Sequence, residues 1–169
     1  MPGILVGVDG SDHSRRALGW AIREAAQHHI PLTVMNVTPG PPRPATHVYW
    51  NMPELPEGGL SSAQARASVQ EFVDKVAHEV GETTADVTIT VVTGDPAQEL
   101  VRASHDADLL VVGHRGTGGF PLLRLGSVSS KVTHHAACPT VVVPAARQAP
   151  HDSADVSHDS ADASHDSAE

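Results

Sequence analysis

The sequence predicts an α/β protein with a single open five-stranded parallel sheet and helices on both faces. Short apolar runs of strand length alternate along the chain with longer segments whose apolar residues recur at helical spacing. The strand-like runs are continuously apolar, which is typical of strands buried on both faces of a parallel sheet. Aromatic residues make up only 3% of the 169 residues, so we expect a core of Val, Leu, Ile and Ala. Strands that alternate with helices imply right-handed parallel crossovers.

Turn residues and helix-capping residues separate the predicted elements. The five predicted strands cover residues 4–9, 32–37, 87–92, 108–113 and 140–144. The four predicted helices cover residues 12–29, 61–80, 96–104 and 127–137. Ser11 or Asp12 is expected to cap the first helix, which Pro31 ends.

Two segments do not fit the α/β pattern. Residues 38–59 contain six prolines and no sustained periodicity, so they are interpreted as a long loop. Residues 151–169 repeat a His-Asp-Ser-Ala motif with a period of seven, and these residue types favour disorder over a helix. We therefore predict one folded domain over residues 1–147 and a disordered acidic repeat tail over residues 148–169.

The charge and the ends of the chain restrict the classes of partner. The formal net charge is −9, and residues 151–169 carry six acidic and no basic residues, which leaves −3 for residues 1–150. This balance does not favour nucleic acid as a partner, and no apolar run approaches the length of a membrane span. Met1 leads directly into a strand pattern without the features of a secretory signal, and Cys138 is the only cysteine. We expect a cytoplasmic protein.

A glycine-rich segment after the fourth predicted strand has the character of a phosphate site. Gly113-His114-Arg115-Gly116 ends that strand, and Gly126-Ser127-Val128-Ser129 begins the last helix. Glycines let backbone N–H groups approach an anion, and a helix start leaves N–H groups unpaired with partial positive charge. We expect four backbone N–H groups and two hydroxyls to converge here. A larger side chain at Gly116 or Gly126 is expected to occupy the space of a phosphate.

Two further segments follow predicted strands on the same edge of the sheet. Asp9-Gly10-Ser11 follows the first strand, and Val37 closes the second. Ligands of open α/β sheets bind at the carboxyl ends of the strands, where the strand order changes direction. If the first and fourth strands are neighbours, Asp9 can reach a ribose or a metal ion, and Val37 offers backbone groups to a flat base. Neither a P-loop nor a dinucleotide-binding glycine pattern is present, so a P-loop kinase and a dehydrogenase are unlikely.

These residues resemble the universal stress protein family, specifically its ATP-binding branch. The resemblance rests on the spacing Gly113-x2-Gly116-x9-Gly126-Ser127, on Asp9-Gly10-Ser11, and on Cys138-Pro139-Thr140-Val141-Val142-Val143, and it covers about residues 2–145. It implies a Rossmann-like fold of the adenine nucleotide alpha-hydrolase type. It also implies ATP or another adenine nucleotide as the ligand, with Mg²⁺ or Mn²⁺, and a homodimer formed through the last strand, Thr140 to Val143.

The resemblance assigns a part of the nucleotide to each segment. Asp9 lies near the ribose and phosphates, the backbone at Val37 contacts adenine, residues 113–116 surround the ribose and phosphates, and residues 126–129 hold the β and γ phosphates. Asp9 is also the expected metal ligand. The predicted site residues are Asp9, Gly10, Ser11, Val37, Val112, Gly113, His114, Arg115, Gly116, Gly126, Ser127, Val128 and Ser129.

The expected function is that of an ATP-binding regulator or sensor in a stress response. No strong catalytic base is evident, so we expect at most slow hydrolysis of ATP. Two alternatives stay open. One is a slow ATPase or autophosphorylating protein in which Ser127 or Ser129 accepts phosphate or Asp9 orients water. The other is a dimeric interaction module without a nucleotide.

Overall fold

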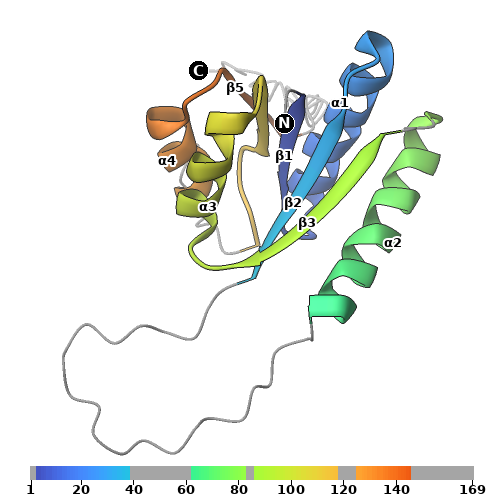
Figure 1. The fold of residues 1–169 in the computed structure, drawn as a ribbon, viewed down its shortest axis with the longest axis horizontal. Coiled ribbons are helices and arrows are strands. Elements are labelled where there is room, and N and C mark those ends of the chain that lie inside the picture. The colour runs from blue at the N-terminus through green and yellow to red at the C-terminus, as the bar shows by residue number, and fades with distance from the viewer. Residues whose placement is uncertain (1–2, 39–61, 83–85, 118–124, 146–169) are drawn as a thin grey trace, which may run out of the picture.

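The structure, a computed structural model, describes residues 3–38, 62–82, 86–117 and 125–145. Within these residues the chain forms five strands and four α-helices (Figure 1). The strands are β1 (Ile4–Val8), β2 (Leu32–Thr38), β3 (Val87–Thr93), β4 (Leu109–Gly113) and β5 (Thr140–Val143). The helices are α1 (Asp12–His28), α2 (Ser62–Val80), α3 (Pro96–Ala103) and α4 (Ser127–His135), and a 3-10 turn, η1 (Ser104–Asp106), follows α3.

The five strands form one parallel sheet in the order β3-β2-β1-β4-β5. The chain moves outward from β1 through β2 to β3, and then returns to place β4 on the other side of β1. The strand order therefore changes direction between β1 and β4, where Val6 pairs with Val111. The predicted five-stranded parallel sheet is confirmed, and the first and fourth strands are neighbours, which is the condition under which Asp9 can reach the glycine-rich segment.

Helices cover both faces of the sheet, as the sequence predicted. Helices α1 and α2 lie on one face, and α3 and α4 lie on the other (Figure 1). Successive residues of a strand point to opposite faces, so each strand contributes to two cores. The first core includes Ile4, Val6, Leu18, Ile22, Val34, Val73, Val76 and Ile89. The second core includes Leu5, Met35, Leu100, Leu110, Val112 and Val132.

Helix α1 begins directly after β1 because Ser11 caps it. The Ser11 Oγ accepts a hydrogen bond from the Ser14 N–H at 3.1 Å, which satisfies one of the unpaired N–H groups of the first turn. Ser11 rather than Asp12 is therefore the cap. The helix ends at His28, and His29 adopts a left-handed conformation with φ 55° shortly before Pro31.

Helix α4 is shorter than the predicted range of residues 127–137. It ends at His135, and the Ala137 N–H donates a hydrogen bond to the Ser104 Oγ at 2.8 Å. In a longer helix the Ala137 N–H would donate to a carbonyl of α4. Here it donates to the hydroxyl of Ser104, which lies after α3. A tertiary contact has shortened the helix, and the sequence pattern of α4 alone does not reveal it.

Two predicted segments lie outside the described residues. These are the long loop at 38–59, apart from Thr38 at the end of β2, and the repeat tail at 148–169. The predicted domain limits at 1–147 and 148–169 therefore stay predictions. No helix among the described residues is long and apolar enough to cross a bilayer.

Candidate functional site

A cavity of about 650 Å³ opens at the carboxyl ends of β1, β2 and β4, at the point where the strand order changes direction. Its volume falls within the range of small-molecule sites, roughly 300–1,000 Å³, and its position is the usual one for ligands of open α/β sheets. The lining residues are Gly7, Val8, Asp9, Ser14, Met35, Asn36, Val37, Thr38, Pro96, Val112, Gly113, Arg115, Gly116, Thr117, Leu125, Gly126, Ser127, Val128 and Ser129.

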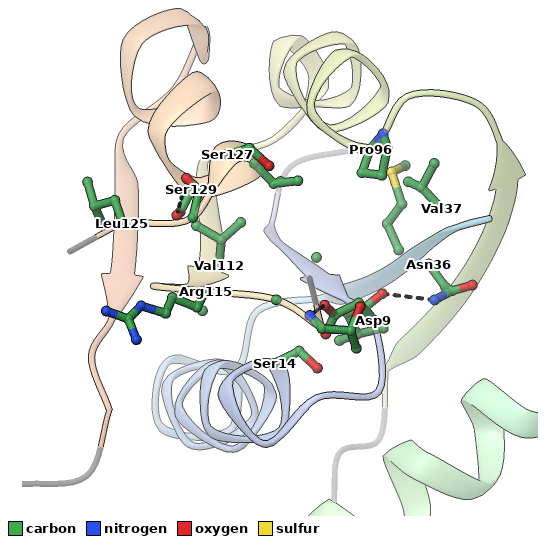
Figure 2. Close-up of a pocket in the computed structure, with 18 of the residues that line it drawn as sticks. Asp9, Ser14, Asn36, Val37, Pro96, Val112, Arg115, Leu125, Ser127 and Ser129 are labelled. Carbon is green, nitrogen blue, oxygen red and sulfur yellow. Dashed lines mark hydrogen bonds between the residues drawn. The ribbon is translucent and has the colours of Figure 1, made fainter. Parts of the chain in front are cut away.

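The cavity has two ends, which we call apolar and polar (Figure 2). Neither end is uniform, since Asn36 lies beside Val37 at the end that we call apolar and Leu125 lies beside Arg115 at the end that we call polar (Figure 2). Val37 and Pro96 lie at the apolar end, and Met35 contributes a buried side chain to the lining. Ser127, at the start of α4, and Arg115 lie toward the other end (Figure 2). A ligand with a flat apolar part and an anionic part would match this division.

The start of α4 supplies the donors of the polar end. Gly126 is the N-cap residue, and the first intrahelical hydrogen bond runs from the Ser130 N–H to the Gly126 carbonyl at 2.9 Å. The N–H groups of Ser127, Val128 and Ser129 precede this bond, and Gly126 has no side chain that could cap them. All three residues line the cavity. They combine unpaired donors with the positive end of the helix dipole, which suits an anion.

Two of the predicted anion donors are used within the protein instead. The Gly126 N–H donates to the His114 carbonyl at 2.8 Å. The Ser129 Oγ lies 2.8 Å from the His114 carbonyl and 3.0 Å from the Gly126 carbonyl, and Ser129 is only 2% exposed. The expectation of four N–H groups and two hydroxyls is therefore wrong. Among the described residues, no partner takes the N–H groups of Ser127, Val128 and Ser129 or the Ser127 hydroxyl.

Asp9 ties the end of β1 to the loop that follows β4. Its Oδ1 accepts hydrogen bonds from the Ser11 N–H at 3.0 Å and the Ser11 Oγ at 2.6 Å, and its Oδ2 accepts one from the Thr117 N–H at 2.9 Å. The last bond joins residues 108 positions apart. Asp9 therefore holds the glycine loop in place at the cavity.

These hydrogen bonds also set the protonation of Asp9. Burial raises the pKa of this carboxyl, but the hydrogen bonds from Ser11 and Thr117 outweigh burial and hold the pKa below its ordinary value. The carboxylate stays ionised at neutral pH and is a weak base. A general base for water activation would need a pKa closer to neutrality.

Asp9 fits a metal ion only as one ligand among others. Its two oxygens already accept three hydrogen bonds, and the described residues contain no group of three or more His, Cys, Asp or Glu that could hold a metal. Mg²⁺ commonly takes one or two protein carboxylates together with waters and the phosphates of a bound nucleotide. Asp9 as a metal ligand therefore stays a prediction that depends on a phosphate-bearing ligand.

Neighbouring protein atoms approach the glycines of the site closely. A Cβ at Gly113 would lie 2.8 Å from the backbone C and O of His13, and a Cβ at Gly116 would lie 2.5 Å from the Asp9 Oδ2. A Cβ at Gly126 would lie 3.2 Å from the Arg115 Cα. The expectation that a larger side chain at Gly116 or Gly126 occupies the space of a phosphate stays a prediction, and the structure adds that the first atom of such a side chain would meet the Asp9 carboxylate or the Arg115 backbone.

His114 lies beside the cavity rather than in its lining. Its ring stands edge-on to that of His13, with the ring centroids 4.4 Å apart, and its Nδ1 is buried without a hydrogen-bond partner among the described residues. Burial lowers the pKa of His114, the charges of His13, Arg115 and Arg16 lower it further, and the Val143 backbone opposes them. The contribution of His114 to the site is its backbone carbonyl, which accepts from Gly126 and Ser129.

Most of the predicted site residues come together at the cavity. Its lining contains Asp9, Val37, Val112, Gly113, Arg115, Gly116, Gly126, Ser127, Val128 and Ser129. Gly10, Ser11 and His114 are outside the lining, and the Ser11 hydroxyl serves Asp9 and the start of α1.

Sequence reasoning missed the neighbours of several predicted residues. Asn36 lines the cavity and its Nδ2 donates to the Val8 carbonyl at 2.9 Å, while Ser14 faces the cavity from the first turn of α1. Pro96 reaches the cavity from the start of α3. The sequence signals that could have identified these residues were their places at the carboxyl end of a strand or at the start of a helix. Which helix face pointed inward depended on the packing.

The fold and the cavity define a class, an open α/β protein with a cavity of small-molecule size at its topological switch point. The family model of the universal stress proteins matches residues 2–144. The chain belongs to the universal stress protein family.

One relative is a universal stress protein of Mycolicibacterium smegmatis, which is 38% identical over 159 residues. That match covers 89% of this chain and 51% of the relative, and the chain spans about half the length of the curated relatives it matches.

The Rossmann-like fold recurs among solved universal stress proteins. UspA from Lactobacillus plantarum has a TM-score of 0.66 and 26% identity, covering 84% of this chain and 97% of that one. A universal stress protein in complex with cAMP has a TM-score of 0.60 and 23% identity, covering 84% and 96%. The protein from Archaeoglobus fulgidus in complex with dAMP has a TM-score of 0.55 and 20% identity, covering 84% and 97%. The last two likenesses show the fold.

Gly113→Ala and Gly116→Ala form a matched pair of variants. Gly113→Ala should lower the free energy of unfolding by about 1–3 kcal/mol, because the added methyl meets the backbone of His13. Gly116→Ala should cost less, since the end of the Asp9 side chain can move, but it should break the bond to Thr117. Urea unfolding measures the first effect, and faster hydrogen exchange of the Thr117 amide in Gly116→Ala measures the second. Equal destabilisation without faster exchange would contradict this account.

His114 should make stability depend on pH. Its pKa is lowered in the folded state, so below about pH 6.5 the unfolded chain takes up the proton more readily and stability falls. His114→Phe keeps a ring beside His13 but cannot be charged, and it should reduce the loss of Tm between about pH 7 and about pH 5.5. His134→Phe, at an exposed position of α4, serves as the control. An identical pH dependence of Tm in both variants would refute the role of His114.

Proposed function

We propose that this chain binds an adenine nucleotide, ATP foremost, and acts as a nucleotide-dependent regulator or sensor in a stress response. The carrying observation is the cavity at the switch point, where the uncapped start of α4 faces the same space as the apolar side chains of Val37 and Pro96. The helix start suits the phosphates, and the apolar end suits the base. Two universal stress proteins of the same fold are complexes with cAMP and dAMP, which supports an adenine nucleotide.

Each part of the cavity has a proposed role in holding the nucleotide. The N–H groups of Ser127, Val128 and Ser129 hold phosphate oxygens, and Arg115 adds positive charge at the same end. The backbone at Val37 meets the base, between Met35 and Pro96. A Mg²⁺ or Mn²⁺ ion would neutralise phosphate charge, with Asp9 as the protein carboxylate available to it.

A regulatory role fits the chemistry better than efficient catalysis. Asp9 is an acid at the cavity whose lowered pKa and engagement by Ser11 and Thr117 make it a poor base. The Ser129 hydroxyl is buried and bonded to two carbonyls, so it is a poor phosphate acceptor. Binding without rapid turnover lets nucleotide occupancy carry information about the cell.

Ser127→Asp and Ser127→Asn test the phosphate end with nearly equal side-chain size. Asp adds a negative charge where the phosphates are proposed to lie, so ATP affinity should fall about tenfold or more, roughly 1.4 kcal/mol, while Asn should leave it nearly unchanged. The stability of α4 should not suffer, because an acid at a helix start is favourable. Calorimetric titration with ATP and Mg²⁺ measures the affinity. No binding by the unmodified protein, or equal binding by both variants, would sink the proposal.

We also propose that the chain forms a homodimer through the outer edge of β5. The two edges of the sheet differ. At β3 the Arg66 Nη1 donates to the Ile89 carbonyl at 2.8 Å, which covers part of that edge. At β5 the Val143 carbonyl accepts from the N–H of His114, the residue that follows β4, so the alternation of a parallel ladder turns the Val142 N–H away from the sheet.

Proline at Val142 tests which edge pairs. Val142→Pro removes the outward donor without touching the bonds to β4, so it should convert the dimer to a monomer. Val91→Pro makes the matching change at the outer edge of β3 and should leave the dimer intact. Analytical ultracentrifugation of both variants, with circular dichroism to verify folding, gives the result. A monomeric unmodified protein, or a dimer that survives Val142→Pro, would overturn this assignment.

A further inference from the structure

Four basic or titratable side chains gather beside the exit of β5, and we refer to them as the basic cluster. They are His13 and Arg16 of α1, and His114 and Arg115 after β4. The His13 and His114 rings are in contact, with centroids 4.4 Å apart. The Arg16 Nε donates to the Pro144 carbonyl at 3.1 Å. The cluster therefore borders the point where the chain leaves the sheet.

The described carboxylates near the cluster are engaged elsewhere. Asp12 pairs with Arg15 at 2.8 Å, and Asp9 accepts its hydrogen bonds from Ser11 and Thr117. The ion pairs among the described residues do not involve His13, Arg16 or His114. The positive charge of Arg16 and Arg115 also contributes to lowering the pKa of His114. An acidic group placed here would relieve this repulsion.

The chain itself supplies such a group a few residues after β5. Residues 151–169 hold Asp152, Asp155, Asp159, Asp162, Asp166 and Glu169 and no Lys or Arg. Asp152 follows Ala145, the last described residue of the β5 exit, by seven positions. Seven extended residues span at most about 25 Å, so the first acids can reach a cluster that already contacts Pro144.

We propose that the acidic segment at 151–169 docks on the basic cluster of its own chain. The acidic segment is the expected occupant because its charge is opposite to that of the cluster and because it is attached to the chain a few residues beyond β5. A segment with three evenly spaced histidines and six acids has no need of a shaped groove, since a set of charge contacts suffices. The docking surface overlaps the proposed nucleotide site only at Arg115, because His13, Arg16 and His114 do not line the cavity.

The docked segment would oppose anion binding in the neighbouring cavity. Arg115 belongs both to the cluster and to the cavity lining, so acids beside it lower the attraction for a phosphate. This consequence rests on the proposed nucleotide function, whereas the docking itself does not. The acidic segment, attached to the same chain, would then compete with the phosphates of a nucleotide for Arg115.

A spin label in the segment tests the docking in the full chain. Cys138→Ser removes the only cysteine and Ser160→Cys places one between Asp159 and Asp162 for a nitroxide. At low salt the amide signals of His13, Arg16 and His114 should lose intensity relative to those of α2. The signals should recover at about 1 M salt, where charges are screened beyond roughly 3 Å.

Two charge reversals provide the matched comparison for this experiment. Arg16→Glu should restore most of the lost intensity, whereas Lys75→Glu, at an exposed position of α2, should not. Absent intensity loss, or equal loss in both variants, would overturn the proposal. A mixture of isotope-labelled chains without the nitroxide and unlabelled chains that carry it distinguishes docking within one chain from docking on a second copy. Intensity loss in that mixture would place the segment on a second copy and would overturn docking within the chain.

Neutralising the segment tests its effect on the cavity separately. Changing Asp152, Asp155, Asp159, Asp162 and Asp166 to Asn in the full chain should raise ATP affinity several-fold at low salt and should abolish the intensity loss. Unchanged ATP affinity together with abolished intensity loss would refute the competition and leave the docking standing. Failure of the unmodified chain to bind ATP would concern the proposed function alone, because the spin-label result does not use a nucleotide.

Discussion

The parallel pairing of β1 with β4 brings together chain segments that are about a hundred residues apart in sequence. Asp9 follows one strand and the glycine loop follows the other, so the Asp9 carboxylate can accept the N–H of Thr117. The same pairing places the first turn of α1 against the end of β4. Only glycine fits at position 113, because a side chain there would meet the backbone of His13. The cavity exists because these two strands are neighbours.

Asp9 illustrates how a site residue can serve structure before chemistry. Its carboxylate is the acceptor that joins the β1 end, the start of α1 and the loop after β4. The donors that hold it also stabilise its charge, which lowers its pKa and weakens it as a base. Asp9 is therefore held as an ionised hydrogen-bond acceptor, and its lowered pKa makes it a poor general base.

Charge is distributed unevenly around this site. The α4 start and Arg115 face the cavity, while Arg16 carries positive charge toward the exit of β5, beside the rings of His13 and His114. Residues 151–169, which follow that exit, hold six of the 20 acidic residues and no Lys or Arg. A chain with a net charge of −9 therefore combines a basic region at one edge of its cavity with a strongly acidic segment tethered close to it. An anionic ligand and the acidic segment are therefore expected to compete for the positive charge of Arg115.

The sequence by itself determined the α/β class, the strands, and most of the cavity residues, because continuous apolar runs, helix caps and glycines have local physical meaning. Asp9, Gly113 and Ser127 were all identified from their places at strand and helix ends. Only the tertiary structure decided how their atoms are used. Gly126 N–H and the Ser129 hydroxyl bond to the His114 carbonyl, and Ser104 shortens α4. These outcomes depend on partners far away in sequence, and hydrogen bonding and close packing select such partners only once the sheet has assembled.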